Sequence, residues 1–180
     1  MLFFNRSLTE AETDVIVIPC GLDGDIRPSS IQWKMMNRFG AGYEMEFLAD
    51  IENDLMSIRE PGMIKPKGEN QPLLINLAIR DMNGNETTPN NILNNLREMI
   101  RFVSVSGVVK TIAVPHFETS FPEICIDNML QCLDDLWKDT IEFHIYTDDQ
   151  PEDPSDIFDP KEDEIPPSLL NNHESMVMVA

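Results

Sequence analysis

The sequence predicts a three-layer α/β/α domain with a largely parallel sheet over its first 147 residues, and three observations carry this prediction. Short apolar runs rich in β-branched residues recur along the chain. Most of these runs are continuous rather than alternating, which is typical of strands covered on both faces. Amphipathic segments separate the runs, and strands that alternate with helices indicate a layered α/β fold.

Five segments have the composition of strands, and all but the last are short, mainly apolar runs. The last alternates between polar and apolar residues and therefore fits an edge or half-exposed strand. In chain order, the predicted strands are Leu2–Phe4, Asp14–Ile18, Leu73–Ile79, Thr111–Val114 and Ile141–Tyr146.

Four helices are predicted between these strands from apolar residues at helical spacing. Ser29 or Ser30 can cap the first helix, and Thr88 with Pro89 forms an N-cap and first-turn pair for the third. Gly107 is placed to end that third helix. The apolar faces are, in chain order, Ile31, Met35 and Phe39; Tyr43, Phe47, Ile51 and Leu55; Leu93, Leu96, Ile100 and Val103; and Met129, Leu133 and Trp137.

The charge balance is strongly acidic, with 32 Asp and Glu residues against 13 Lys and Arg and a net charge of −19. This balance disfavours non-specific binding to nucleic-acid phosphates and favours a protein partner with a basic surface. No apolar run of about 18 residues predicts a membrane span, and the first residues do not resemble a signal peptide. Three widely spaced cysteines without a CxxC pair predict a reduced, cytoplasmic chain with no metal site.

Acidic residues are concentrated at the C-terminal end. Residues 147–180 hold ten Asp and Glu, one Lys and five of the 13 prolines, a composition that resists both helix and sheet. We therefore expect a domain over residues 1–147 and an acidic tail over residues 148–180. The tail fits either a disordered solubilising segment or a docking segment, because two apolar anchors lie within it. These anchors are Ile157-Phe158 and Leu169-Leu170.

Four blocks of the chain resemble the macro domain family, specifically the branch of antitoxin-type ADP-ribosyl glycohydrolases. They are Asp14–Val17; Ile31–Phe39; Gly62–Ile64 with Leu74–Ala78; and Pro89–Met99 with Val109–Pro115. The resemblance covers residues 1 to about 147 and leaves the acidic tail unmatched. It implies a mixed, mainly parallel sheet and a pocket for ADP-ribose, although a fold by itself does not fix a function.

The loops that hold the ligand in that family are altered here. The segment after the first long strand keeps Gly21 and Gly24 but has Pro28 and Ser30 where the family has glycines. The second phosphate loop is altered further: Glu118, Ser120 and Pro122 occupy glycine positions. Glycine lets backbone N–H groups approach a diphosphate, whereas proline removes a donor and a carboxylate repels phosphate. We expect these loops to bind ADP-ribose poorly.

The catalytic position of the family is also altered. In the antitoxin-type branch a lysine after the third block attacks the ribose, and Arg80 stands at that position here. A guanidinium stays protonated, so Arg80 cannot be the nucleophile. Asp81 acts as a base only if the register slips by one residue. The resemblance thus implies a pseudoenzyme with no catalytic residue, and no cofactor is expected.

The candidate ligand site gathers residues that follow the predicted strands or lie in them. His116 fits either a loop side chain bonded to backbone or a ligand contact. Carboxylates at the same sheet edge, namely Asp23, Asp25, Asp81, Glu118 and Glu123, form either a solvated acidic rim or a site for a cation or basic peptide. The full candidate set is Gly21, Asp23, Gly24, Asn76, Arg80, Asp81, His116, Glu118 and Ser120.

Three functions follow from these observations. The first is a non-catalytic macro-domain-like protein that binds another protein through its acidic surface and tail. The second is a divergent ADP-ribose or nucleotide-derivative binder or hydrolase, favoured by the retained Asp14 and Asn76. The third is an acidic inhibitor that imitates nucleic acid, favoured by charge alone. The small size and the Asn- and Met-rich style also suggest a phage protein, which would act in the host cytoplasm.

Overall fold

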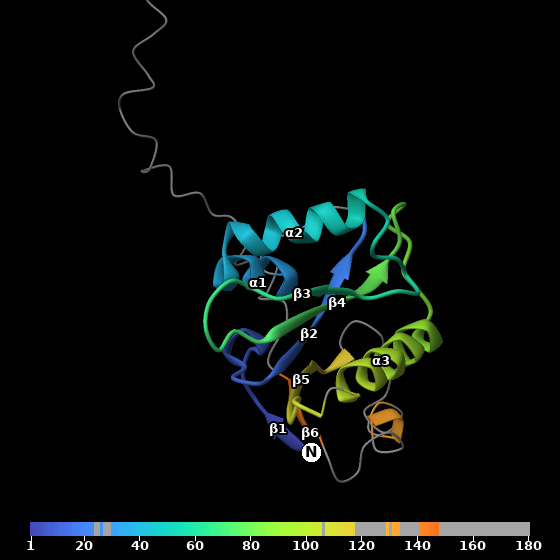
Figure 1. Cartoon of the computed structure of the whole chain (residues 1–180). Helices are drawn as coiled ribbons and strands as arrows, with labels where there is room; N and C mark the ends of the chain where they lie inside the picture. The colour runs from blue at the N-terminus through green and yellow to red at the C-terminus, as the bar shows by residue number, and fades with distance from the viewer. Residues whose placement is uncertain are drawn as a thin grey trace, which may run out of the picture. The chain divides into compact units, whose positions relative to one another are not determined.

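A computed structural model describes residues 1–23, 26, 30–105, 107–117, 129, 131–133 and 141–147, all within the unit Met1–Gln150. This part of the chain holds a six-stranded sheet with the order β1-β6-β5-β2-β4-β3 (Figure 1). The pairing is parallel throughout except between β3 and β4, which are antiparallel. The strands are β1 (Leu2–Phe4), β2 (Val15–Gly21), β3 (Gly62–Ile64), β4 (Leu73–Arg80), β5 (Thr111–Pro115) and β6 (Glu142–Tyr146). The mixed, mainly parallel sheet predicted from the sequence is confirmed.

The helices are α1 (Ile31–Phe39), α2 (Ala41–Glu52) and α3 (Pro89–Ser104), with a short 3-10 turn, η1, at Leu8–Glu10. Two of them, α1 and α3, begin at caps expected from the sequence. The Ser30 hydroxyl accepts a hydrogen bond from the Trp33 N–H, and the Thr88 hydroxyl accepts one from the Asn91 N–H. These bonds satisfy backbone donors that have no partner within the first helical turn.

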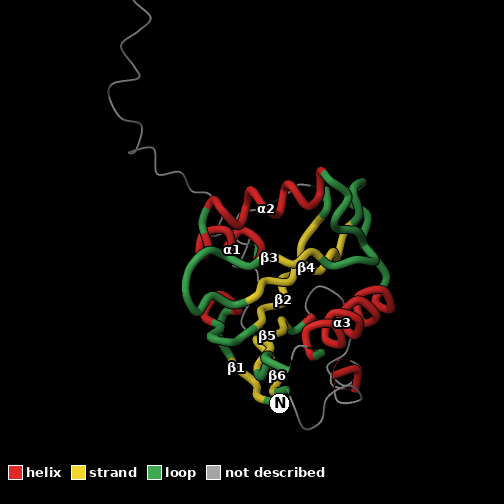
Figure 2. The backbone as a smooth tube through the Cα atoms, in the orientation of Figure 1, coloured by secondary structure: helices red, strands yellow, loops and turns green. Residues whose placement is uncertain are grey.

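The sheet lies between two helical layers, which Figure 2 shows in red on its two sides. Alternate residues of β2 point to opposite faces because strand side chains alternate. Val15 and Val17 pack in the core under α3, whereas Ile16 and Ile18 pack in the core under α1 and α2. All four side chains are buried, so the three-layer arrangement predicted from the apolar runs is confirmed.

Two details differ from the sequence-based expectation. The alternating strand β6 pairs with both β1 and β5, so it lies inside the sheet and the edge alternative is wrong. Its half-exposed pattern is observed, with Glu142 exposed and Phe143 buried. The predicted apolar face of α2 reaches too far, because the helix ends at Glu52 and leaves Leu55 exposed. A positive φ at Asp54 turns the chain away at this point.

The fourth predicted helix is described only in part. Met129 and Leu133 are helical and buried, as expected for its apolar face, and Trp137 lies outside the described residues. In the part of the chain that the structure describes, no helix has both the length and the apolar character needed to cross a membrane.

Candidate functional site

The candidate site begins where β2 and β4 end side by side. The two strands are parallel, and the register places Cys20 beside Ala78 and then Gly21 beside Arg80, with an irregularity between the two steps. The Leu22 N–H donates to the Arg80 carbonyl at 3.1 Å, which extends the pairing one step beyond β2. In a parallel sheet the carboxyl ends of neighbouring strands form the edge at which ligands commonly bind.

An ion pair lies at this edge. Arg80 Nη2 is 3.1 Å from Asp23 Oδ1, and the two side chains are only 18% and 15% exposed. The pair links residues 57 positions apart in the sequence and ties the segment after β2 to the end of β4. A half-buried guanidinium with a carboxylate partner is a fixed positive charge with strong geometric preference.

Gly21 is the residue over which this ion pair lies. A Cβ atom added at Gly21 would lie 2.5 Å from Arg80 Nη2 and closer still to Asp23 Oδ1. Real Cβ atoms do not approach other atoms so closely, so any larger residue here would displace the pair. The glycine predicted to serve a phosphate thus has a second role, which is to let Arg80 and Asp23 meet.

The layer beneath the ion pair is buried and partly polar. Asn76 faces the core under α1 and α2, and its side-chain oxygen accepts a 2.6 Å hydrogen bond from the Tyr43 hydroxyl. Its Nδ2 atom has no hydrogen-bond acceptor among the residues that the structure describes. Burial raises the pKa of the Tyr43 hydroxyl and of the neighbouring Cys20 thiol well above their ordinary values. Both groups are therefore protonated at neutral pH, and Cys20 is not a nucleophile.

The Asp81 carboxylate accepts hydrogen bonds from the turn that follows β4. One of its carboxylate oxygens accepts hydrogen bonds from the N–H groups of Asn83 and Asn85, at 2.8 and 2.9 Å. The Asn85 side chain also donates to Asp81. The side-chain and backbone hydrogen bonds from Asn85, together with Asn83, lower the pKa of Asp81 below its ordinary value. A carboxylate with a lowered pKa is a weaker general base than an ordinary aspartate.

His116 follows β5 at the same edge of the sheet, on the side of β2 opposite Arg80. Its backbone N–H donates to the Tyr146 carbonyl at 2.9 Å, so the segment after β5 is held against the end of β6. The other members of the candidate set lie outside the described residues. These are Gly24, Glu118 and Ser120, together with Asp25, Pro28, Pro122 and Glu123 of the neighbouring loops and Ile157, Phe158, Leu169 and Leu170 of the predicted tail.

Asp14 lies at the opposite edge of the sheet and ties strands together. Its carboxylate accepts hydrogen bonds from the N–H groups of Lys110 and Thr111, at 2.7 and 2.9 Å, and its carbonyl accepts one from the Leu73 N–H. Partial burial alone would raise the pKa of Asp14, but these backbone hydrogen bonds outweigh it and hold the pKa below its ordinary value. This arrangement joins the amino ends of β2, β4 and β5.

Sequence reasoning missed two contributors to the site. Tyr43 was placed on a buried helical face, and its hydroxyl needed a polar partner there, which is the signal that could have linked it to Asn76. Gly84 lies in the turn after Asp81, and a Cβ atom there would be 3.5 Å from Asp23 Oδ2. Within the described ranges, no group of three or more His, Cys, Asp or Glu side chains is arranged to hold a metal ion.

Comparisons with known proteins find likeness at the level of structure. No family model matches the sequence, and no curated protein matches it. The macrodomain of Thermus aquaticus DarG superposes with a TM-score of 0.62 and 14% identity over 81% of this chain and 96% of that one. The macrodomain of Mycobacterium tuberculosis DarG gives a TM-score of 0.64 and 14% identity over 84% and 97% of the two chains.

A third similar structure is that of a protein in complex with a ligand. Thermosipho africanus DarTG, in complex with ADP-ribose, superposes with a TM-score of 0.61 and 11% identity over 81% of this chain and 40% of that one. Identities this low establish a common fold and leave the chemistry to the residues of each site. The resemblance to macro domains in the sequence blocks and the likeness in structure agree, and the chain has the macrodomain fold.

Proposed function

We propose that this macrodomain-fold protein is a non-catalytic binding protein that engages a partner with a basic surface. The observation that carries the proposal is Arg80, which stands where the family branch that the sequence resembles has its nucleophilic lysine. The Arg80 guanidinium is held against Asp23 at 3.1 Å and cannot supply the neutral amine that attack on a ribose requires. Neither Cys20 nor Asp81 replaces it, because the thiol is buried and protonated and the carboxylate is bound in a turn.

Charge supports protein binding as the function. A net charge of −19 speeds encounter with a basic surface and opposes approach to nucleic acid. The predicted tail adds apolar anchors, Ile157-Phe158 and Leu169-Leu170, within acidic sequence. Each anchor buried at a partner contributes about 1.5–3 kcal/mol, or roughly ten-fold to a hundred-fold in affinity. We further propose that the protein acts in the cytoplasm, which would be that of the host if it is encoded by a phage.

Truncation and anchor variants test this proposal. A chain that ends at Thr147 keeps the hydrogen bond from the Thr147 N–H to the Phe4 carbonyl and should stay folded. We expect it to lose the basic proteins that the full chain captures from a lysate, and capture by the full chain should weaken as salt rises. A full-length variant with the four anchor residues changed to Ser keeps every charge and isolates the apolar contribution. Equal capture by the truncated and full-length chains would place the binding surface on the domain itself.

A second candidate function is binding of ADP-ribose or a related nucleotide. It is favoured by the solved neighbour in complex with ADP-ribose and by the positive charge of Arg80 at the sheet edge. Calorimetric titration of the full chain with ADP-ribose separates the two candidates. Heat of binding with a dissociation constant of about 10 μM or below would favour the nucleotide, and its absence up to about 1 mM would favour the protein partner.

A further inference from the structure

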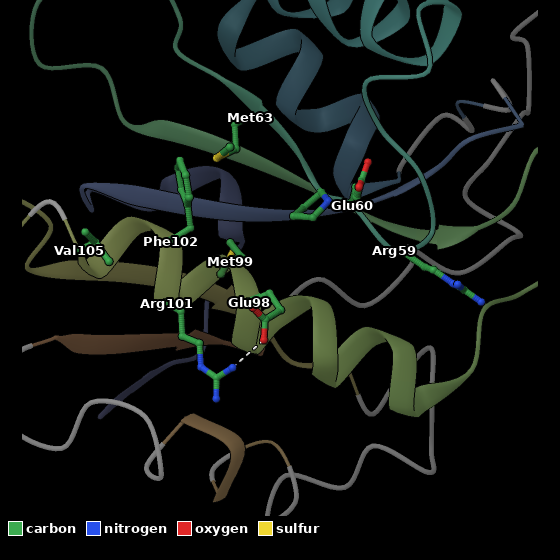
Figure 3. Close-up of a pocket in the computed structure, with 9 residues that line it drawn as sticks. Arg59, Glu60, Met63, Glu98, Met99, Arg101, Phe102 and Val105 are labelled. Carbon is green, nitrogen blue, oxygen red and sulfur yellow. Dashed lines mark hydrogen bonds and ion pairs between the residues drawn. The ribbon is translucent and has the colours of Figure 1, made fainter.

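An apolar groove lies between α3 and the edge strand β3, on the helical layer opposite α1 and α2. Its volume is about 470 Å³. Met63 of β3, Met99 and Phe102 of α3, and Val105 at the C-cap of that helix supply its apolar wall. Figure 3 shows the Phe102 side chain extending from α3 toward Met63. The groove is remote from Arg80 and Asp23, which lie at the carboxyl ends of β2 and β4.

Three of the four apolar wall residues are exposed, whereas Met99 is buried. Phe102 is 64% exposed, Val105 is 87% exposed and Met63 is 43% exposed. The core-facing stripe of α3 instead consists of buried residues such as Leu96, Ile100 and Val103. Phe102 and Val105 therefore lie beside that stripe and leave an apolar surface facing solvent. Exposed apolar clusters of this kind commonly mark interaction surfaces.

The charges around the groove are balanced, in contrast to the rest of the chain. Its rim carries two arginines, Arg59 and Arg101, and two glutamates, Glu60 and Glu98. All lining residues come from the segment 59–110, which carries seven Lys and Arg and five Asp and Glu. The remainder of the chain carries six Lys and Arg and 27 Asp and Glu. A second copy of this chain would be repelled over most of such an acidic molecule, and the charge balance of this segment reduces that repulsion.

A balanced rim also matches the symmetry of a pair of identical chains. In a two-fold interface the same patch meets itself, so a patch that carries equal numbers of positive and negative charges is complementary to its own copy. Arg101 and Glu98 form an ion pair at 2.7 Å with both side chains more than half exposed. Because an exposed pair of this kind is held weakly, each member can exchange its partner for the equivalent residue of a second copy.

We propose that the groove between α3 and β3 is a homodimer interface, in which the residues around the groove of one chain contact the same residues of a second copy. Phe102 and Val105 of each chain pack against Met63 and α3 of the other, and the arginines and glutamates of the two rims pair across the two-fold axis. Salt should strengthen this association, because screening the repulsion between two chains of net charge −19 outweighs the weakening of the few exposed ion pairs of the rims, and the apolar contact stays in place. A basic foreign partner would show the opposite dependence on salt.

Sedimentation of the full chain from about 1 μM to about 1 mM tests the proposal. We expect a shift from the 20.5 kDa monomer to twice that mass as concentration and salt rise. Phe102→Glu should weaken the association roughly ten-fold to a hundred-fold, and Val105→Glu is a second variant at a more exposed position. Met45→Glu on α2, where Met45 is 71% exposed, is the matched control and should leave the association unchanged.

Exchanging the charges of Arg101 and Glu98 provides an independent test of the proposed interface. Arg101→Glu should weaken association by making the rim acidic, and the double variant with Glu98→Arg should restore it by restoring the balance. A chain that stays monomeric at every concentration and salt would overturn the proposal. So would a dimer that Phe102→Glu and Val105→Glu leave intact while both variants keep the wild-type circular dichroism.

Discussion

At the residue scale, the proposal of a non-catalytic protein rests on Arg80. A lysine at this position could lose its proton and attack a sugar carbon, whereas the arginine stays charged and pairs with Asp23. Gly21 makes the pair possible, because its missing side chain leaves room for both partners.

Two glycine substitutions test that dependence. Gly21→Ala should lower the free energy of unfolding by about 0.5–1 kcal/mol, because its Cβ would push the ends of the Arg80 and Asp23 side chains out of contact. Gly42→Ala is the matched control, since Gly42 lies in α2 with nothing within 4 Å of its added Cβ. It should raise the free energy of unfolding by about 0.5–1 kcal/mol through better helix propensity. Urea unfolding of both variants measures the sign of each change in the free energy of unfolding. Equal changes in the two variants would contradict the role assigned to Gly21.

The ion pair also predicts how the site responds to an anionic ligand. Asp23 competes with any phosphate that approaches Arg80, so Asp23→Asn should strengthen binding of ADP-ribose about three-fold to ten-fold. The reason is that the neutral amide leaves the positive charge of Arg80 uncompensated. Calorimetric titration of both chains at high ligand concentration measures this ratio. Weaker binding by Asp23→Asn would mean that Asp23 itself contacts the ligand.

The sequence identified Arg80 as a site residue but did not predict that Asp23 would be its ion-pair partner. Arg80 was identifiable from the apolar block before it and the macro-domain pattern around it. Asp23 was assigned to a ligand site or an acidic rim, because a contact across 57 residues depends on the register of β2 against β4. Asn76 was read as a ligand contact, while in the structure its oxygen accepts from the buried Tyr43 hydroxyl.

At the scale of elements, Asp14 holds the amino ends of three strands together. The hydrogen bonds from Lys110 and Thr111 stabilise its ionised form and lower its pKa. Asp14 was noted in the sequence as a retained family residue that favours ligand binding. Its position at the opposite edge of the sheet from Arg80 instead gives it a direct part in joining β2 to β4 and β5.

The pH dependence of stability tests that role. Because the pKa of Asp14 is lower in the folded chain than in the unfolded one, its contribution is present above the unfolded pKa of about 4 and is lost as pH falls through the folded value. Asp14→Ala should therefore lower the free energy of unfolding by about 1 kcal/mol at pH 7, a modest value because the site is exposed. The difference should shrink as the pH is lowered below about 4 in a series of urea titrations. A difference that is constant with pH would contradict this account.

The elements themselves were largely predictable, and the exceptions have physical causes. Continuous apolar runs identified β2, β4 and β5, and side-chain caps identified the starts of α1 and α3. Strand β3 is three residues long and carries little periodicity, so only its resemblance to a family block pointed to it. The place of β6 inside the sheet could not be derived from its own alternation, because strand order is set by crossovers between distant segments.

At the scale of the whole molecule, our proposal of binding rather than catalysis rests on the macrodomain fold and on the residues at its sheet edge. The fold supplies the edge at which β2, β4 and β5 end, and the sequence places there a permanently charged arginine, a buried thiol and a carboxylate held in a turn. The acidic charge of the chain then favours a basic protein as the partner.

A turnover assay tests the absence of catalysis most directly. The full chain is incubated in excess with ADP-ribosylated protein and with ADP-ribosylated DNA, beside an active ADP-ribosyl hydrolase, and released ADP-ribose is measured over time. We expect no release above that of the substrate alone, because Arg80 cannot supply a neutral nucleophile. Release that disappears in Asp81→Ala or Arg80→Ala, with both variants folded, would contradict the account and show that this edge of the sheet is an active site.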